Sequence, residues 1–285
     1  MKHQCIEQLQ QKAEPVGALC RVLGVSPSGY YASRRRKQAF KQACPISAHL
    51  QAAFAESGKS YGSRRLRAAL ARKHIRVGRH RVRKLMKINN LHSTWKRKFV
   101  HTTDSRHNLP VADNVLERQF TPAAMNRAWA ADITYIPTRR GWLYLAVVMD
   151  LYSRKIVGWA MAAHMPAQLV CAALHMALSQ RHPPAGLIVH SDRGSQYASQ
   201  AHRALLARHS CTASMSRKAN CWDNAVMERF FLNLKMERVW QRDYLNPDEA
   251  TRDVTDYIVG FYNSKRLHST LGYLPPNVYE FKSAA

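Results

Sequence analysis

The sequence predicts an α/β protein: a mixed five-stranded sheet with flanking helices, preceded by small all-helical segments. Three runs rich in β-forming residues occupy 128–137, 142–150 and 154–161, and short turn-like links join them as antiparallel neighbours. From residue 166 onwards, helix-periodic runs alternate with short apolar runs. Residues 14–91 instead carry helical patterns separated by turns. These three observations together indicate one sheet-bearing core behind a helical front part.

The charge of the chain is strongly positive and unevenly spread. Its 285 residues include 44 Lys and Arg against 18 Asp and Glu, which gives a formal net charge of +26. Residues 1–119 hold 25 basic and 6 acidic side chains, whereas residues 120–285 hold 19 and 12. A compact protein avoids such self-repulsion unless its partner is a polyanion. The first part is therefore expected to grip nucleic acid, and the second to hold the main core.

The sequence indicates neither a membrane protein nor a secreted one. It has no run of 18 apolar residues, and its first residues lack the apolar stretch of a signal peptide. The six cysteines form no Cys-x-x-Cys pair and no zinc-type spacing with histidine. We therefore expect reduced thiols in a cytoplasmic protein.

Two helical units are expected in the basic half. Residues 1–45 contain a helix, a Gly turn and a second helix capped by Ser26, which together are helix-turn-helix-like. Residues 46–92 contain three helices, the second of which is expected to be capped by Ser63. Residues 93–120 lose this periodicity and are expected to be a basic linker. The two units would form the nucleic-acid grip.

The third helix of the second unit has a strongly basic surface. Val82, Leu85 and Met86 form a narrow apolar stripe, and basic residues cover the rest. A helix divided in this way can lie on or in a DNA groove. The residues expected to contact DNA from this unit are Arg64, Arg65, Arg79, Arg81, Arg83 and Lys84.

Three acids in the second half are candidates for a metal site. Asp132 lies in the first strand, Asp192 directly follows the apolar run 186–191, and Glu228 lies near the start of a helix. Carboxylates that converge from two strands and a helix can hold Mg²⁺ or Mn²⁺. Two such ions about 3.5–4 Å apart can activate the attacking oxygen and stabilise the leaving oxygen of a phosphodiester. Spacing alone is weak support, because a chain with 18 acids contains many such triples.

The sequence around these acids is more specific than their spacing. The phrases WAADITYI, HSDRGSQY, DNAVMERFF and FYNSKRLHSTLGYLPP occur in this order, with 35 residues between Asp192 and Glu228. They resemble the DDE transposases of bacterial insertion sequences, specifically OrfB of the IS3 family. The resemblance covers most of the chain, from near residue 45 to Pro276.

This resemblance implies an RNase H-like integrase catalytic core at 121–241 and a C-terminal helix with a tail motif at 242–285. The expected element order is that of the RNase H-like fold, whose first and fourth strands are neighbours. Asp132 and Asp192 would then lie side by side. With Glu228 they would be the catalytic residues and the ligands of two Mg²⁺ or Mn²⁺ ions. Lys235, two helical turns after Glu228, would contact the DNA backbone beside the reacting phosphate.

The implied activity is metal-dependent cleavage and strand transfer of insertion-sequence ends, which amounts to transposition through DNA recombination and integration. The implied partners are double-stranded DNA at the element ends and at the target, and further copies of the chain on that DNA. The chain shows no OrfA-like leucine zipper, so an OrfA fusion or partner is also expected. The implied location is the bacterial cytoplasm, at the nucleoid, with no membrane partner.

Two other classes of function stay open at this point. A retroviral-type integrase shares the acid triad, but the chain lacks its His-His-Cys-Cys zinc module and carries the phrase LGYLPP near its end. A non-catalytic DNA-binding regulator of transposition would explain the charge and the helices equally well. It would not need three acids in matching contexts.

Several other polar residues near these motifs have structural interpretations. Asp150 ends the second strand before a turn, where an Asp is usually structural, so Asp132 is preferred as the first acid. His190 is expected to be a satisfied core residue, and Asp223 or Asn224 to cap the Glu228 helix. The tail residues that match the family could pin a C-terminal turn to the core; they are Asn263, Arg266, His268 and Gly272.

Overall fold

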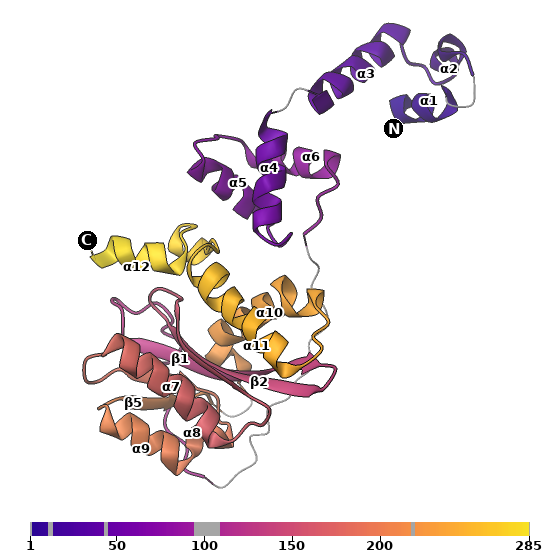
Figure 1. Ribbon diagram of the computed structural model, residues 1–285. Helices are drawn as coiled ribbons and strands as arrows, with labels where there is room; N and C mark the ends of the chain where they lie inside the picture. The colour runs from indigo at the N-terminus through magenta and orange to yellow at the C-terminus, as the bar shows by residue number, and fades with distance from the viewer. Residues whose placement is uncertain (1, 11–13, 43–44, 94–108, 218–219, 285) are drawn as a thin grey trace.

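The computed structural model describes residues 2–10, 14–42, 45–93, 109–217 and 220–284 (Figure 1). Its centre is one five-stranded sheet in the order β3-β2-β1-β4-β5. The first three strands pair antiparallel, whereas β4 runs parallel to both β1 and β5. The predicted mixed sheet is therefore confirmed. The strands are β1 (Ala128–Thr138), β2 (Gly141–Asp150), β3 (Ile156–Ala162), β4 (Ile188–Ser191) and β5 (Thr212–Met215).

Helices cover both faces of this sheet (Figure 1). Side chains alternate along β1, so that Trp129 and Ala131 join the core under α7, while Ala128 and Ala130 join the core under α10 and α11. The sheet is thus buried on both sides. The covering helices are α7 (Ala167–Arg181), α8 (Ser195–Ala198) and α9 (Gln200–Arg208) on one face, and α10 (Ala225–Glu237) and α11 (Pro247–Asp256) on the other.

Two of the predicted helices are not continuous α-helices. The single helix expected near 197–209 is divided at Ser199, whose hydroxyl accepts the His202 N–H at 3.3 Å and so begins α9 as its cap. The helix expected near 247–262 is α-helical only to Asp256 and continues as a π-helix over Tyr257–Asn263. π-Helical turns are rare and often occur at functional positions.

The helical front part forms two small bundles. The first has its own apolar cluster around Ile6, Cys20 and Tyr30, and Ser26 accepts the Gly29 N–H at 3.1 Å, as the predicted cap would. Its first helix was not expected. The helices of the first bundle are α1 (Lys2–Gln10), α2 (Val16–Val22) and α3 (Pro27–Gln42), and those of the second are α4 (Pro45–Glu56), α5 (Ser63–Arg72) and α6 (Arg79–Ile88).

The second group, called the α4–α6 bundle below, corrects one expectation. Ser63 is the first residue of α5 and not its cap; Gly62 occupies the cap position, and no side chain bonds there. The predicted stripe of α6 is confirmed in that Val82 and Leu85 are buried. The expected linker 93–120 lies largely outside the described residues. Across the parts of the chain that are described, no helix combines the length and apolar character needed to cross a membrane.

The C-terminal segment is joined to the sheet-bearing part by hydrogen bonds to Glu280. Glu280 accepts hydrogen bonds from Ser153 Oγ at 2.8 Å, Lys155 Nζ at 2.9 Å and Arg181 Nη2 at 2.8 Å. Because Glu280 is buried, these partners are needed to offset its desolvation. The remaining elements are the 3₁₀ turns Cys221–Asn224, Val239–Gln241 and Ser269–Leu271 and the last helix, α12 (Pro276–Ala284).

Candidate active site

Asp132 and Asp192 come together because β1 and β4 are parallel neighbours. Ala130 pairs with His190, and each acid lies two residues beyond this last pair. The Ile133 N–H donates to Asp132 Oδ1 at 2.8 Å, and the Gly194 N–H donates to Asp192 Oδ1 at 3.0 Å. Both side chains are only partly buried. The sheet thus places two carboxylates beside one another where β4 ends.

Glu228 and Lys235 are presented by α10. The helix packs on the sheet through Met227, Phe230 and Leu234, which leaves Glu228 in its first turn and Lys235 on the same side two turns later. Lys235 Nζ lies 4.6 Å from the centre of the Tyr135 ring, a cation–π distance that holds the ammonium beside β1. Both polar side chains are partly exposed.

The electrostatics of Asp132 link the four groups into one site. Burial raises the pKa of this carboxyl well above its ordinary value, and the negative charges of Asp192 and Glu228 raise it further. The Lys235 ammonium acts in the opposite direction on the same pKa. The charges of Glu228 and Lys235 on α10 thus both act on Asp132 of β1.

Two residues at the start of α10 make contacts that were not expected. Asn224 occupies the cap position of the helix, as expected, but its side chain makes no cap hydrogen bond, and Asp223 lies in the 3₁₀ turn before it. Asn224 Nδ2 donates to the Ala131 carbonyl at 3.3 Å, and so joins the start of α10 to the residue before Asp132. Asp223 accepts from Arg217 Nη2 at 2.9 Å and from Arg118 Nε at 2.7 Å. Both contacts fix the helix that carries Glu228.

Tyr197 is a neighbour of the site that the sequence patterns did not single out. Its ring is buried, and among the described residues its hydroxyl has no hydrogen-bond partner. Burial raises the pKa of this phenol well above its ordinary value, and the charges of Asp132 and Asp192 add to the effect. The hydroxyl is therefore neutral beside the two acids. The one sequence feature that could have pointed to Tyr197 is its position in the phrase HSDRGSQY, which also contains Asp192.

Two other titratable residues of the sheet, His190 and Asp150, are structural, as expected. His190 is buried between two hydroxyls, Ser214 Oγ at 2.9 Å and Ser216 Oγ at 3.2 Å, and burial lowers its pKa to about 4. Asp150 is fully buried and accepts the N–H groups of Asn126 and Tyr152, each at 2.9 Å. Neither side chain faces the three candidate acids as a ligand.

The carboxylate oxygens of Asp132, Asp192 and Glu228 suit a hard divalent cation, although the three side chains do not converge on one point. Within the described ranges, no three His, Cys, Asp or Glu side chains stand ready to hold a metal ion. The charges of Asp192 and Glu228 disfavour ionisation of Asp132, and a cation bound between the acids would relieve that repulsion. Carboxylate oxygens are the ligands that Mg²⁺ and Mn²⁺ prefer. Side-chain rotation would be needed to complete such a site.

The basic residues expected to contact DNA divide into two groups. Arg64 on α5 is exposed. Arg65, in contrast, has a side chain that is only 28% exposed and lies 3.7 Å from Glu237 of α10. It faces the sheet-bearing part of the molecule. The four basic residues expected to contact DNA from α6 are all exposed; they are Arg79, Arg81, Arg83 and Lys84.

Models of known families match both the helical front part and the sheet-bearing part of the chain. Two models described as integrase core domain match residues 122–221 and 209–276, and a model described as HTH-like domain matches residues 41–99. The HTLV-2 integrase catalytic core domain in complex with magnesium is 16% identical, with a TM-score of 0.44, over 55% of this chain and 98% of that one. The BIV integrase catalytic core domain is 20% identical, with a TM-score of 0.42, over 56% and 96%.

Relatives that match over nearly the full length are insertion-sequence proteins. The uncharacterized 31 kDa protein of insertion element IS600 from Shigella sonnei is 44% identical over 269 residues, which cover 93% of this chain and 98% of that protein. Transposase InsF of insertion sequence IS3A from Escherichia coli strain K12 is 40% identical over 291 aligned residues, covering all of both chains. A retroviral-type integrase and a non-catalytic regulator are therefore set aside. The chain belongs to the IS3 family of insertion-sequence transposases, and its integrase core domain makes it a polynucleotidyl transferase.

Proposed function

We propose that Asp132, Asp192 and Glu228 are the catalytic triad of this transposase and hold two Mg²⁺ or Mn²⁺ ions. The observation that supports this most strongly is the parallel register of β1 and β4, which brings the two aspartates together beside the Glu228 helix. When bound, such ions activate the attacking oxygen and stabilise the leaving oxygen of a phosphodiester. The carboxylates act as ligands, so no covalent link between protein and DNA is expected.

The side chains around the triad would orient the DNA. Lys235 is held over the Tyr135 ring within electrostatic reach of Asp132, and its ammonium would bind a phosphate oxygen beside the bond that breaks. Asn224 would keep the start of α10 fixed on β1 while this happens. Water would first hydrolyse a phosphodiester at the element end and so free a 3′-OH. This hydroxyl would then attack a phosphodiester of the target, and the target's own 3′ oxygen would leave as that bond breaks.

The α4–α6 bundle would supply much of the DNA affinity. Arg79, Arg81, Arg83 and Lys84 are exposed on α6, whose apolar stripe is used for packing within the bundle. Exposed arginines and lysines on one helix neutralise phosphates and place the helix on the duplex. Arg64 on α5 would add to the same surface.

The partners are proposed from the same features. The DNA would be double-stranded and would comprise the ends of the element and its target, bound by more than one copy of the chain. An OrfA segment, fused by frameshifting or supplied separately, would complete the active transposase. The net charge of +26 supports a location at the bacterial nucleoid in the cytoplasm.

A strand-transfer assay tests this function. Labelled element-end DNA is incubated with the purified chain and Mg²⁺ or Mn²⁺, beside the variants Glu228→Gln and Glu117→Gln. Glu117 is an exposed acid outside the site and serves as the matched control. Metal-dependent joining that is lost only in Glu228→Gln supports the proposal. Joining that survives this substitution contradicts it, and absence of joining in the wild type calls for the same assay with the OrfA–OrfB fusion.

A further inference from the structure

A buried ion pair lies at the C-terminal end of α10. Glu237 accepts hydrogen bonds from Arg266 Nε at 2.8 Å and Nη2 at 2.7 Å, and from Tyr257 Oη at 2.7 Å. The Arg266 side chain is 1% exposed and the Glu237 side chain 6%. Burying two charges is costly, and a well-packed apolar pair of similar volume is often as stable or more so. A two-pronged Arg–carboxylate pair, however, fixes orientation as well as distance.

The α4–α6 bundle reaches this pair from the other side. Arg65 Nη1 lies 3.7 Å from Glu237 Oε1. The Leu267 N–H donates to Tyr61 Oη at 2.7 Å, and the Leu267 side chain is buried in the apolar core of the bundle. The tail segment that contains Arg266 and Leu267 is therefore inserted between the bundle and α10.

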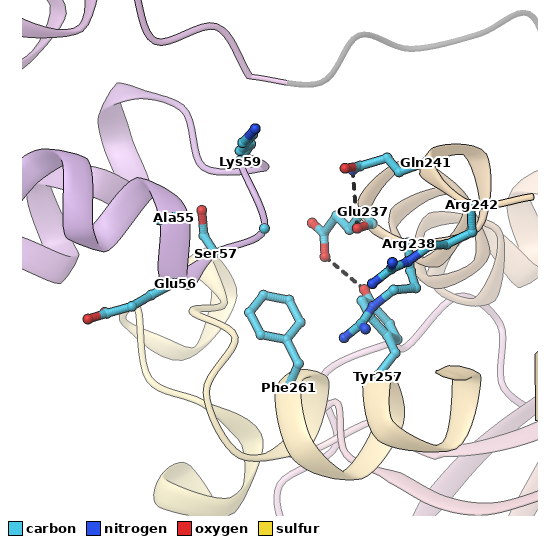
Figure 2. A pocket seen from close by; sticks show the side chains of 11 residues that line it. Ala55, Glu56, Ser57, Lys59, Glu237, Arg238, Gln241, Arg242, Tyr257 and Phe261 are labelled. Carbon is cyan, nitrogen blue, oxygen red and sulfur yellow. Dashed lines mark hydrogen bonds between the residues drawn. The ribbon is translucent and has the colours of Figure 1, made fainter. Parts of the chain in front are cut away.

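A cavity lies beside this contact, at the boundary between the two parts. Figure 2 shows Glu237 and Tyr257 at one side of a cavity of about 480 Å³, with the turn after α4 at the other. The cavity is also lined by Lys59 from the bundle and by Arg242 from the segment after α10. The two parts are thus joined by these directed bonds and by the packing of Leu267, Phe261 and Tyr273 against the apolar core of the bundle.

The same helix carries the ion pair and a candidate catalytic acid. Glu228 and Glu237 are nine residues apart on α10, which corresponds to roughly 13 Å along the helix axis. Because an α-helix of this length is rigid, a displacement of Glu237 at one end also displaces Glu228 near the other end. The bundle, which carries the exposed basic helix α6, is therefore mechanically linked to Glu228.

We propose that Glu237 and Arg266, together with Tyr61 and Arg65 of the bundle, are positioning residues that set which phosphodiester is cut. They fix the distance from the DNA gripped by the α4–α6 bundle to the Glu228 end of α10. This rests on the proposed function of Glu228. It gives a role to Arg266 of the tail motif, which donates two hydrogen bonds to Glu237, and it assigns Arg65 to this contact in place of DNA.

The test distinguishes the loss of the contact made by Tyr61 and Arg65 from the loss of a positive charge on the bundle. The double variant Tyr61→Phe with Arg65→Gln removes both polar links from the bundle side and leaves the buried pair intact. Lys73→Gln is the matched control, because it also removes one positive charge from the bundle and its partner Glu56 lies within the bundle, exposed, at 3.0 Å. Two quantities are measured on the full chain: hydrogen exchange at the Leu267 amide, and the cut positions on end-labelled element DNA.

In the double variant we expect faster exchange at Leu267 and, at the normal phosphodiester, cleavage slower than in Lys73→Gln by roughly 10- to 100-fold, the range that a shift of about 1 Å can produce. Cuts at neighbouring phosphodiesters should appear. Cleavage that stays at the normal position at the control's rate overturns the proposal, whatever the exchange shows. If the wild type does not cut at all, the proposed function fails on its own. Hydrogen exchange at the Leu267 amide then tests the contact between the bundle and the tail. Unchanged exchange in the double variant overturns this contact, and faster exchange supports it.

Discussion

Asp132 and Asp192 stand level on two parallel strands, each two residues beyond the last backbone pair that joins β1 to β4. This placement depends on register, because a shift by one residue would turn one of the two side chains to the opposite face of the sheet. The cores on both faces fix the register, since Trp129 and Ala130 of β1 are fully buried on opposite sides. The candidate site is thus a consequence of how the sheet packs.

Replacement of Lys235 should weaken catalysis more than folding. In Lys235→Ala we expect a loss of roughly 10- to 100-fold in kcat/KM for cleavage, because a hydrogen bond from a charged donor contributes about 1.5–3 kcal/mol. Lys235→Arg, which keeps the charge, should restore part of this loss. Arg252→Ala on the exposed side of α11 is the control. Equal kinetics in Lys235→Ala and the control would remove Lys235 from the site.

The binding of α6 to DNA should be visible in the salt dependence of affinity. Removing one side chain that neutralises a phosphate should reduce the slope of log K against log salt by roughly 0.9. The double variant Arg79→Ala with Arg83→Ala should therefore lower the slope by about 1.8. Titration of element-end DNA at several salt concentrations measures this. An unchanged slope would show that these exposed residues do not touch phosphates.

Gly158 of β3 should not tolerate a side chain. A Cβ at this position would lie 2.2 Å from the Ala173 carbonyl oxygen and 2.8 Å from the Ala177 Cβ, both on α7. Because the obstacle is helix backbone, Gly158→Ala should lower the free energy of unfolding by about 1–3 kcal/mol or more. Gly17→Ala, where no atom lies within 4 Å, is the control and should not destabilise. Urea unfolding of both variants compares them.

His190 should make the fold sensitive to acid. Burial lowers its pKa from 6.5 to about 4, so between these pH values the unfolded chain takes up a proton that the folded chain does not. The free energy of unfolding is therefore reduced as pH falls through this window, and the His190 penalty is absent well above pH 6.5. From pH 7 to pH 5 the wild type should lose about 2 kcal/mol more than His190→Asn. His209→Asn, at an exposed site, should behave as wild type.

The sequence was sufficient to predict the strands and helices whose apolar residues recur at the regular spacing of a strand or a helix. The alternation along β1 and the apolar stripe of α6 could be predicted because burial of Trp129, Val82 and Leu85 follows directly from that period. Helix α1 was missed because, of its nine residues, only Ile6 is buried. A single apolar anchor gives no periodic signal.

Contacts across long stretches of sequence could not be predicted. Asn263 donates to the Ile156 carbonyl at 2.9 Å and accepts the Ile156 N–H at 3.0 Å, and so completes the hydrogen bonding at the edge strand β3. The residue matched a motif, but its partner is 107 positions away. The contact of Arg65 with Glu237 was hidden for the same reason, since a basic residue on a basic helix is expected to face DNA. Charge alone does not say which way a side chain turns.

Binding of Mn²⁺ in the presence of element-end DNA tests the central claim most directly. Paramagnetic resonance counts the bound ions in the wild type, in Asp132→Asn, Asp192→Asn and Glu228→Gln, and in Asp243→Asn, whose exposed acid pairs only with Arg139 among the described residues. We predict that the wild type and Asp243→Asn bind two ions per site and that each triad variant loses at least one. If the triad variants bind both ions as tightly as the wild type, these carboxylates are not the metal ligands and the account of the active site is wrong.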